Sequence, residues 1–80
     1  MNELEILRED PEFDEWGMEI NGRTLSGFQH LFSFSIRETS AGVYRMSIRS
    51  VDSVETIPDL SISQVKEKLV EMRFIYVHLQ

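Results

Sequence analysis

The sequence predicts a small α+β domain in which a mainly antiparallel sheet of four to five strands packs on one helix near residues 62–73. The strands are predicted by an asparagine–glycine turn at residues 21–22 and by later segments that alternate apolar and polar residues. Apolar residues at helical spacing predict the helix. A chain of 80 residues, 41% of them hydrophobic, holds one compact core, so residues 1–80 are expected to form a single domain. Within it we expect an acidic segment (1–19), two hairpins (13–51), and a helix followed by a strand (60–80).

Residues 2–9 are expected to form a short N-terminal helix. Asn2 and Glu5 stand at the N-cap and N3 positions of a capping box, in which each side chain bonds a backbone N–H of the first turn. Pro11 prevents the helix from continuing, and it pushes Asp10 toward an extended backbone.

Residues 16–27 predict the first hairpin. Asn21 and Gly22 both tolerate a positive φ, which a two-residue type I′ turn requires, and this turn places Ile20 opposite Arg23. The same pairing brings four apolar side chains onto one face of the hairpin: Trp16, Met18, Ile20 and Leu25.

Residues 28–51 carry the clearest alternation in the chain and predict the second hairpin. Gly42 is expected to supply the left-handed residue of a turn at residues 39–42. A register with Ile36 opposite Tyr44 buries one face, and a slip of one residue would expose it. The six apolar residues of that face are Phe32, Phe34, Ile36, Tyr44, Met46 and Ile48.

The rest of the chain predicts a connector, a helix and a last strand. Pro58 marks the connector, and Ser61 with Gln64 forms a second capping box at the start of the helix. Residues 74–79 are rich in β-branched and aromatic side chains, so we expect them to form an interior strand. Because no glycine ends the helix after Arg73, its continuation through these residues is the alternative.

The composition and the motifs exclude several classes of protein. The absence of cysteine excludes disulfide scaffolds and thiolate metal sites, and it favours a cytoplasmic location for so small a chain. No apolar run approaches the roughly 20 residues of a membrane span. His30 and His78 do not lie at metal-ligand spacing, and no nucleophile elbow or phosphate-binding loop is present. We therefore expect no enzyme and no cofactor.

One short acidic pattern begins like a calcium loop, with Asp10, Glu12 and Asp14 at alternate positions. The glycine position of that motif is Glu15 and its bidentate glutamate position is Asn21, so the rest of the motif fails. A solvated acidic segment is the expected structure, with no bound metal.

The charge of the chain is concentrated at its N-terminus. Residues 1–19 carry eight acids and one base, for a net charge of −7, whereas residues 20–80 carry six acids and seven bases, for +1. This asymmetry predicts a non-enzymatic module, of the inhibitor, immunity or anti-defence type, that covers a basic surface of a protein partner. Phe13 is expected as an exposed anchor. Trp16 is in phase with Met18 and Ile20 on the apolar face of the first hairpin, so it is expected in the core. The predicted partner-binding residues are Glu9, Asp10, Glu12, Phe13, Asp14, Glu15, Trp16 and Glu19.

Two other functions remain open. Arg37, Arg45 and Arg49 share the polar face of the second hairpin and form a candidate surface for single-stranded nucleic acid. Single-strand binders usually place aromatic rings among such arginines, and we expect the rings here to point into the core. The preferred interpretation is therefore a solvent-exposed sheet face whose arginines form ion pairs with the acidic N-terminus. The second alternative is a structural subunit of a homo-oligomer, such as a homodimer, because small cores often gain burial by association.

Overall fold

The computed structural model describes residues 2–29 and 32–79, and the side chains of those residues apart from 15, 29 and 74–79. A short helix, α1 (Glu3–Arg8), is followed by a 3₁₀ helix, η1 (Pro11–Trp16), and a long helix closes the chain, α2 (Ile62–Leu79). The strands between them are β1 (Glu19–Asn21), β2 (Thr24–Gln29), β3 (Phe32–Ser40), β4 (Val43–Arg49) and β5 (Val54–Leu60).

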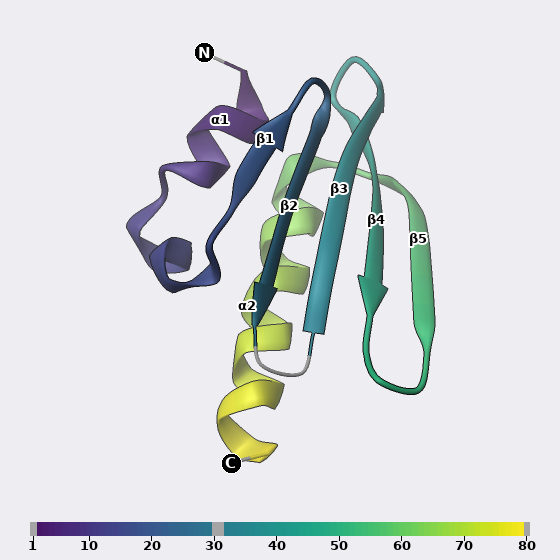
Figure 1. The fold of residues 1–80 in the computed structure, drawn as a ribbon. Helices are drawn as coiled ribbons and strands as arrows, with labels where there is room; N and C mark the ends of the chain where they lie inside the picture. The colour runs from purple at the N-terminus through teal and green to yellow at the C-terminus, as the bar shows by residue number, and fades with distance from the viewer. Residues whose placement is uncertain (1, 30–31, 80) are drawn as a thin grey trace.

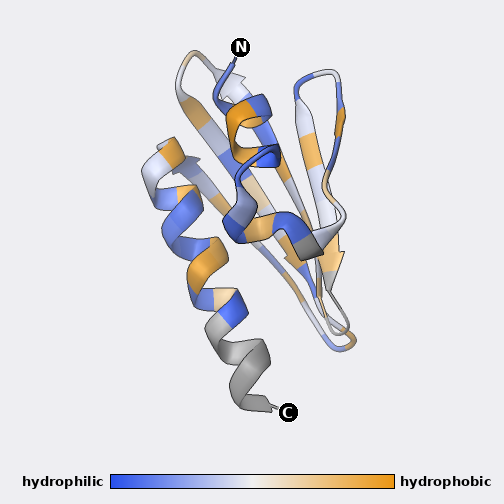
Figure 2. Ribbon diagram, turned by 90° about the vertical axis from the view of Figure 1, so that its left-hand side faces the viewer, coloured by the Kyte–Doolittle hydropathy of each residue, from blue (hydrophilic) through white to orange (hydrophobic). Residues whose placement is uncertain are grey.

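The five strands form one antiparallel sheet in the order β1-β2-β3-β4-β5, and α2 lies across one side of it (Figure 1). Viewed from the edge formed by β1, α1 and η1 lie in front of the sheet and α2 lies to one side of it (Figure 2). The predicted fold class is confirmed. We call the side of the sheet that packs on the helices the covered side, and the opposite side the open face.

A single cluster of buried side chains fills the space between the sheet and the helices. Strand residues alternate between this cluster and the open face, because successive side chains of a strand point to opposite sides. The helices contribute side chains from α1, η1 and the first three turns of α2. The members of the cluster are Leu4, Leu7, Phe13, Trp16, Leu25, Phe34, Ile36, Tyr44, Met46, Ile48, Val65, Leu69 and Met72.

Both hairpins keep the predicted faces but not the predicted registers. Ile20 pairs with Leu25 instead of Arg23, so the two turn residues are Gly22 and Arg23. Gly22 has a φ of 64°, whereas Arg23 is not among the described residues with positive φ, an arrangement typical of a type II′ turn.

In the second hairpin Ile36 pairs with Met46 instead of Tyr44. Gly42 has the expected left-handed backbone, with a φ of 75°. Each register differs from the prediction by two residues, and a shift of two leaves every side chain on its own face.

Both predicted N-caps form, although only the second is a complete capping box. The Glu5 amide donates to Asn2 Oδ1 over 2.9 Å at the start of α1. At the start of α2 the Gln64 amide donates to Ser61 Oγ over 3.2 Å, and the Ser61 amide donates back to Gln64 Oε1 over 2.9 Å. Both halves of this capping box are therefore present, and they fix the point at which the last helix begins.

Two elements near the C-terminus differ from the prediction. Most of the expected connector (54–63) is the edge strand β5, in which Pro58 falls in the register break between Ile57 and Leu60, where the ladder to β4 is interrupted. The expected strand at residues 74–79 is wrong, because α2 continues to Leu79. The fifth strand therefore precedes the helix, and the helix ends the fold.

Candidate binding surfaces

The acidic N-terminal segment is anchored in the core. Leu4 and Leu7 of α1 and Phe13 and Trp16 of η1 are all buried. The Phe13 and Trp16 rings meet edge to face, with centroids 5.9 Å apart, and Trp16 also contacts Phe34. The expectation that Phe13 is an exposed anchor is wrong, because only 1% of its surface is accessible, while the core position expected for Trp16 is confirmed.

The local sequence explains why Phe13 turns inward. Asp10 has an extended backbone and its Oδ1 accepts the Glu12 amide over 3.0 Å, which caps η1 with Pro11 in its first turn. Strand parity therefore does not apply to residues 11–16. Gly17 ends the segment with a left-handed φ of 53°, and the chain then enters β1.

A buried hydroxyl ties this segment to the centre of the sheet. Tyr44 on β4 donates from its phenol to Glu3 Oε1 over 3.0 Å. Burial, the hydrogen bond to Glu3 and the negative charges of Glu3 and Glu38 together raise the pKa of Tyr44 to about 12. The phenol is therefore protonated and donates throughout the physiological pH range.

Two further carboxylates of the segment pair with α2. Asp10 Oδ2 lies 3.5 Å from Lys66 Nζ, and Glu12 Oε1 lies 3.9 Å from Arg73 Nη1. Arg73 also donates to the Glu12 carbonyl oxygen over 3.0 Å. These contacts lie on the helix side of the molecule, so the expectation that the acids fold back across the sheet arginines is wrong within the described residues.

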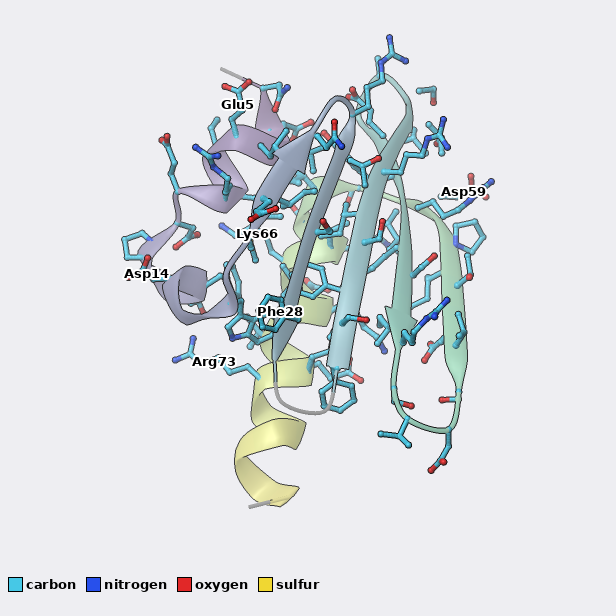
Figure 3. The ribbon with its side chains drawn as sticks, in the orientation of Figure 1. Glu5, Asp14, Phe28, Asp59, Lys66 and Arg73 are labelled. Carbon is cyan, nitrogen blue, oxygen red and sulfur yellow. The ribbon has the colours of Figure 1, made fainter. Side chains whose placement is uncertain are left out.

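The remaining described carboxylates of this segment have no ion-pair partner among residues 2–29 and 32–73. Glu9 and Asp14 are exposed and Glu5 is half-buried. Figure 3 shows Glu5 and Asp14 on the outer side of α1 and η1, at the opposite side of the view from Asp59 of β5. We call this surface, with Glu5, Glu9 and Asp14, the acidic flank. Glu19 lies apart from it, on the open face of β1, and the Glu15 side chain falls outside the described part of the chain.

The open face is built from aligned polar rows that cross the strands. Cross-strand pairing places Arg37 opposite Arg45 and Ser33 opposite Arg49. The middle row holds mostly hydroxyls, and its members are Glu19, Ser26, Ser35, Ser47 and Thr56. No acid pairs with the three sheet arginines among the residues whose side chains are described.

An aromatic ring lies on this face, although the sequence predicts that the rings point into the core. Phe28 belongs to β2 and pairs with Ser33, so its side chain points to the open face and is 68% exposed. In the structure Gly27 is a strand residue whose missing β-carbon leaves room for the Phe34 ring and the Trp16 carbonyl oxygen.

A hollow of about 490 Å³ lies over the middle of the open face. Small residues form its floor, including Gly27, Ser35 and Ser47. Larger side chains border it, namely Glu19, Phe28, Arg49 and Val54. The hollow thus combines an aromatic ring, a guanidinium group and several hydroxyls in one place.

Metal ligands and histidines are the remaining candidates for a chemical site. No group of three or more potential metal ligands occurs among the described side chains. His30 lies outside the described residues, and His78 lies in the last turns of α2, where only the backbone is described. No helix in the described ranges has the length and apolar character needed to cross a membrane.

Comparison with known proteins found no family model, no curated protein and no solved structure that matches the chain. The acidic flank and the open face are therefore the features that bear on the function.

Proposed function

We propose that the protein is a non-enzymatic binding module of the inhibitor type, and that its acidic flank covers a basic surface of a protein partner. The observation that carries this proposal is the rigid attachment of the acidic segment. Four apolar side chains on α1 and η1 are buried in the core, while Glu5, Glu9 and Asp14 on the same two elements reach outward.

Rigid attachment matters because a flexible acidic tail must lose conformational freedom when it binds. Segments that are already ordered avoid most of that entropic cost, so more of the contact energy appears as affinity. The capped 3₁₀ helix and the Tyr44–Glu3 hydrogen bond hold the flank in one arrangement before the partner arrives.

Charge complementarity would supply the rate and the specificity of this association. The first 18 residues carry −6, and the pairing of Lys66 and Arg73 with Asp10 and Glu12 reduces this to about −4 for the flank and its neighbours. A concentrated negative surface attracts a basic partner and accelerates encounter. The cysteine-free composition fits a cytoplasmic site of action.

The test is affinity capture from lysate of the source cells with the triple variant Glu5→Gln, Glu9→Gln, Asp14→Asn. The matched control removes three exposed acids elsewhere, with Asp52→Asn, Asp59→Asn and Glu67→Gln. We expect one dominant basic protein to be retained by the wild type and the control, and to be lost from the flank variant. The association rate with the purified partner should fall as salt rises.

Equal retention of the partner by both triple variants would refute the proposal, since only net charge and not its position would then matter. Circular dichroism of both variants confirms that the fold is intact, which is expected because the substituted side chains lie outside the core.

A further inference from the structure

We propose that the open face of the sheet binds single-stranded nucleic acid, with a base stacked on Phe28 and phosphates held by Arg49, Arg37 and Arg45. This site is separate from the acidic flank and does not depend on the function proposed for it. The inference rests on the exposed ring, the arrangement of the arginines and the shallow hydroxyl-lined floor between them.

The ring is positioned for stacking. Phe28 lies beside Gly17, where a β-carbon would be 3.6 Å from a ring carbon, and 68% of its surface is accessible. Every base offers a flat face, so stacking on an exposed ring tolerates any sequence. Phe28 thus supplies the aromatic ring that the sequence pattern does not predict for the arginine face.

The first arginine lies within reach of a nucleotide stacked on that ring. Phe28, Ser33, Arg49 and Val54 form one row across β2 to β5. Phe28 and Arg49 are therefore two strands apart, or about 10 Å. A long guanidinium side chain spans much of that distance and can hold a phosphate next to the stacked base.

The other two arginines favour a chain of nucleotides over a single one. Arg45 lies four residues before Arg49 on β4, which is about 13 Å along the strand, and it faces Arg37 across the ladder. Like charges directly opposite destabilise a sheet, so this pair does not serve stability. A strand with several phosphates would neutralise both groups of arginines at once.

The floor between the arginines suits a sugar–phosphate backbone. Ser35 and Ser47 face each other in the middle row, and Ser47 Oγ lies 3.5 Å from Thr56 Oγ1. These hydroxyls donate and accept hydrogen bonds without adding bulk, so the hollow of about 490 Å³ stays open above them.

The local charge of this face is opposite to that of the whole chain. The three arginines, against Glu19 and against Asp59 in the register break opposite Arg45, leave this face with a net charge of about +1, although the protein carries −6 overall. The acidic flank lies on the helix side of the sheet edge, and at physiological salt charges are screened beyond about 8 Å. The net negative charge should slow the encounter at low salt without blocking the site.

The test is fluorescence anisotropy with labelled oligothymidine and oligouridine at low salt, using the wild type, Phe28→Ala and Arg49→Gln. We expect Phe28→Ala to weaken binding roughly 5- to 100-fold, the loss of one stacked base. Arg49→Gln should lower the slope of log affinity against log salt by about 0.7, the loss of one phosphate contact. Glu19→Gln should strengthen binding, because it removes an acid that borders the hollow.

Two matched controls keep the test specific. Ile6→Ala removes an exposed apolar side chain from α1, and Arg8→Gln removes an exposed arginine from the same helix. Neither should change the affinity. An unchanged anisotropy with both oligonucleotides at low salt would overturn the proposal, and so would equal loss in the control variants. Competition by thymidine monophosphate at the concentration of the oligonucleotide would also overturn it, because the site would then hold one nucleotide and not a strand.

Discussion

The two sides of one sheet show how differently the same strands are constrained. On β3 the residues of the covered side, Phe34 and Ile36, are buried, whereas Ser35 between them faces outward and Arg37 is exposed. The covered side is held by packing, so its residues have few acceptable replacements. Residues of the open face are not held by packing in this way. Packing therefore does not explain an exposed ring there, or two arginines opposite each other on neighbouring strands. Three pairs of substitutions test this difference, each with one member in the buried core and one on the open face.

The largest difference is expected between two phenylalanines. Phe13 is 1% exposed and Phe28 is 68% exposed. Phe13→Ala should lower the free energy of unfolding by about 3–5 kcal/mol, because it removes a large buried side chain and leaves a cavity. Phe28→Ala should change it by about 0.5 kcal/mol or less, as a surface substitution does. Urea denaturation of both variants measures the two values, and comparable losses would show that the open face is part of the stabilising core.

The second comparison concerns neighbours on β2. A β-carbon at Gly27 would lie 2.7 Å from the Phe34 ring and 2.9 Å from the Trp16 carbonyl oxygen. Gly27→Ala should therefore destabilise the protein by about 1–3 kcal/mol, as overpacking does. Ser26→Ala, one residue earlier on the open face, should change stability by about 0.5 kcal/mol or less. Thermal unfolding followed by circular dichroism compares the two, and a neutral Gly27→Ala would mean that η1 does not press against β2.

The smallest effect is expected from two hydroxyls of β4. Tyr44→Phe removes the hydrogen bond to Glu3 and should cost about 0.5–1.5 kcal/mol at neutral pH. The folded pKa of about 12 exceeds the ordinary 10.0, so the stabilisation is complete below pH 10 and is lost as the pH rises toward 12. The stability difference between wild type and variant should shrink over that range.

Ser47→Ala on the open face is the matched control, because its hydroxyl has only the 3.5 Å contact with Thr56. It should leave both the stability and its pH dependence unchanged. Denaturant titrations at several pH values, with the absorbance of tyrosinate followed in parallel, measure both quantities. A constant difference between wild type and Tyr44→Phe up to pH 12 would contradict the assigned pKa.

The alternation of the strands could be predicted because only one face of the sheet is buried, so apolar residues recur at every second position. The faces of β2, β3 and β4 follow from period two, but their registers do not, since a shift of two residues buries the same side chains. The choice between Met46 and Tyr44 as the partner of Ile36 depends on the turn and on the irregular pairing between Glu38 and Ser40. Sequence patterns describe that geometry less well than they describe burial.

The two wrong elements have different physical reasons. β5 is an edge strand whose residues are mostly exposed, so it lacks the alternation that marked the other strands. Residues 74–79 have high β-propensity but follow a capped helix with no glycine or proline to end it. Propensity of this kind depends on its surroundings, and continuation of an existing helix prevailed.

The candidate sites were predicted unevenly. The acidic residues were found from composition alone, whereas their partners Lys66 and Arg73 come from a helix far along the chain. Phe13 is expected to be exposed, but it belongs to a 3₁₀ helix that buries it. Phe28 points to the open face, where no ring is expected. In each case the local backbone decided which side of the molecule the ring faces.

The edges of the sheet bear on self-association. β1 has only three residues, and β5 carries Pro58 beside Asp59, whose φ of 59° accompanies a register break opposite β4. Neither edge offers a long flat row of free amide and carbonyl groups, so further copies cannot readily extend the sheet into a fibre. Concentrated solutions of the folded chain should consequently resist ordered polymerisation through the sheet edges.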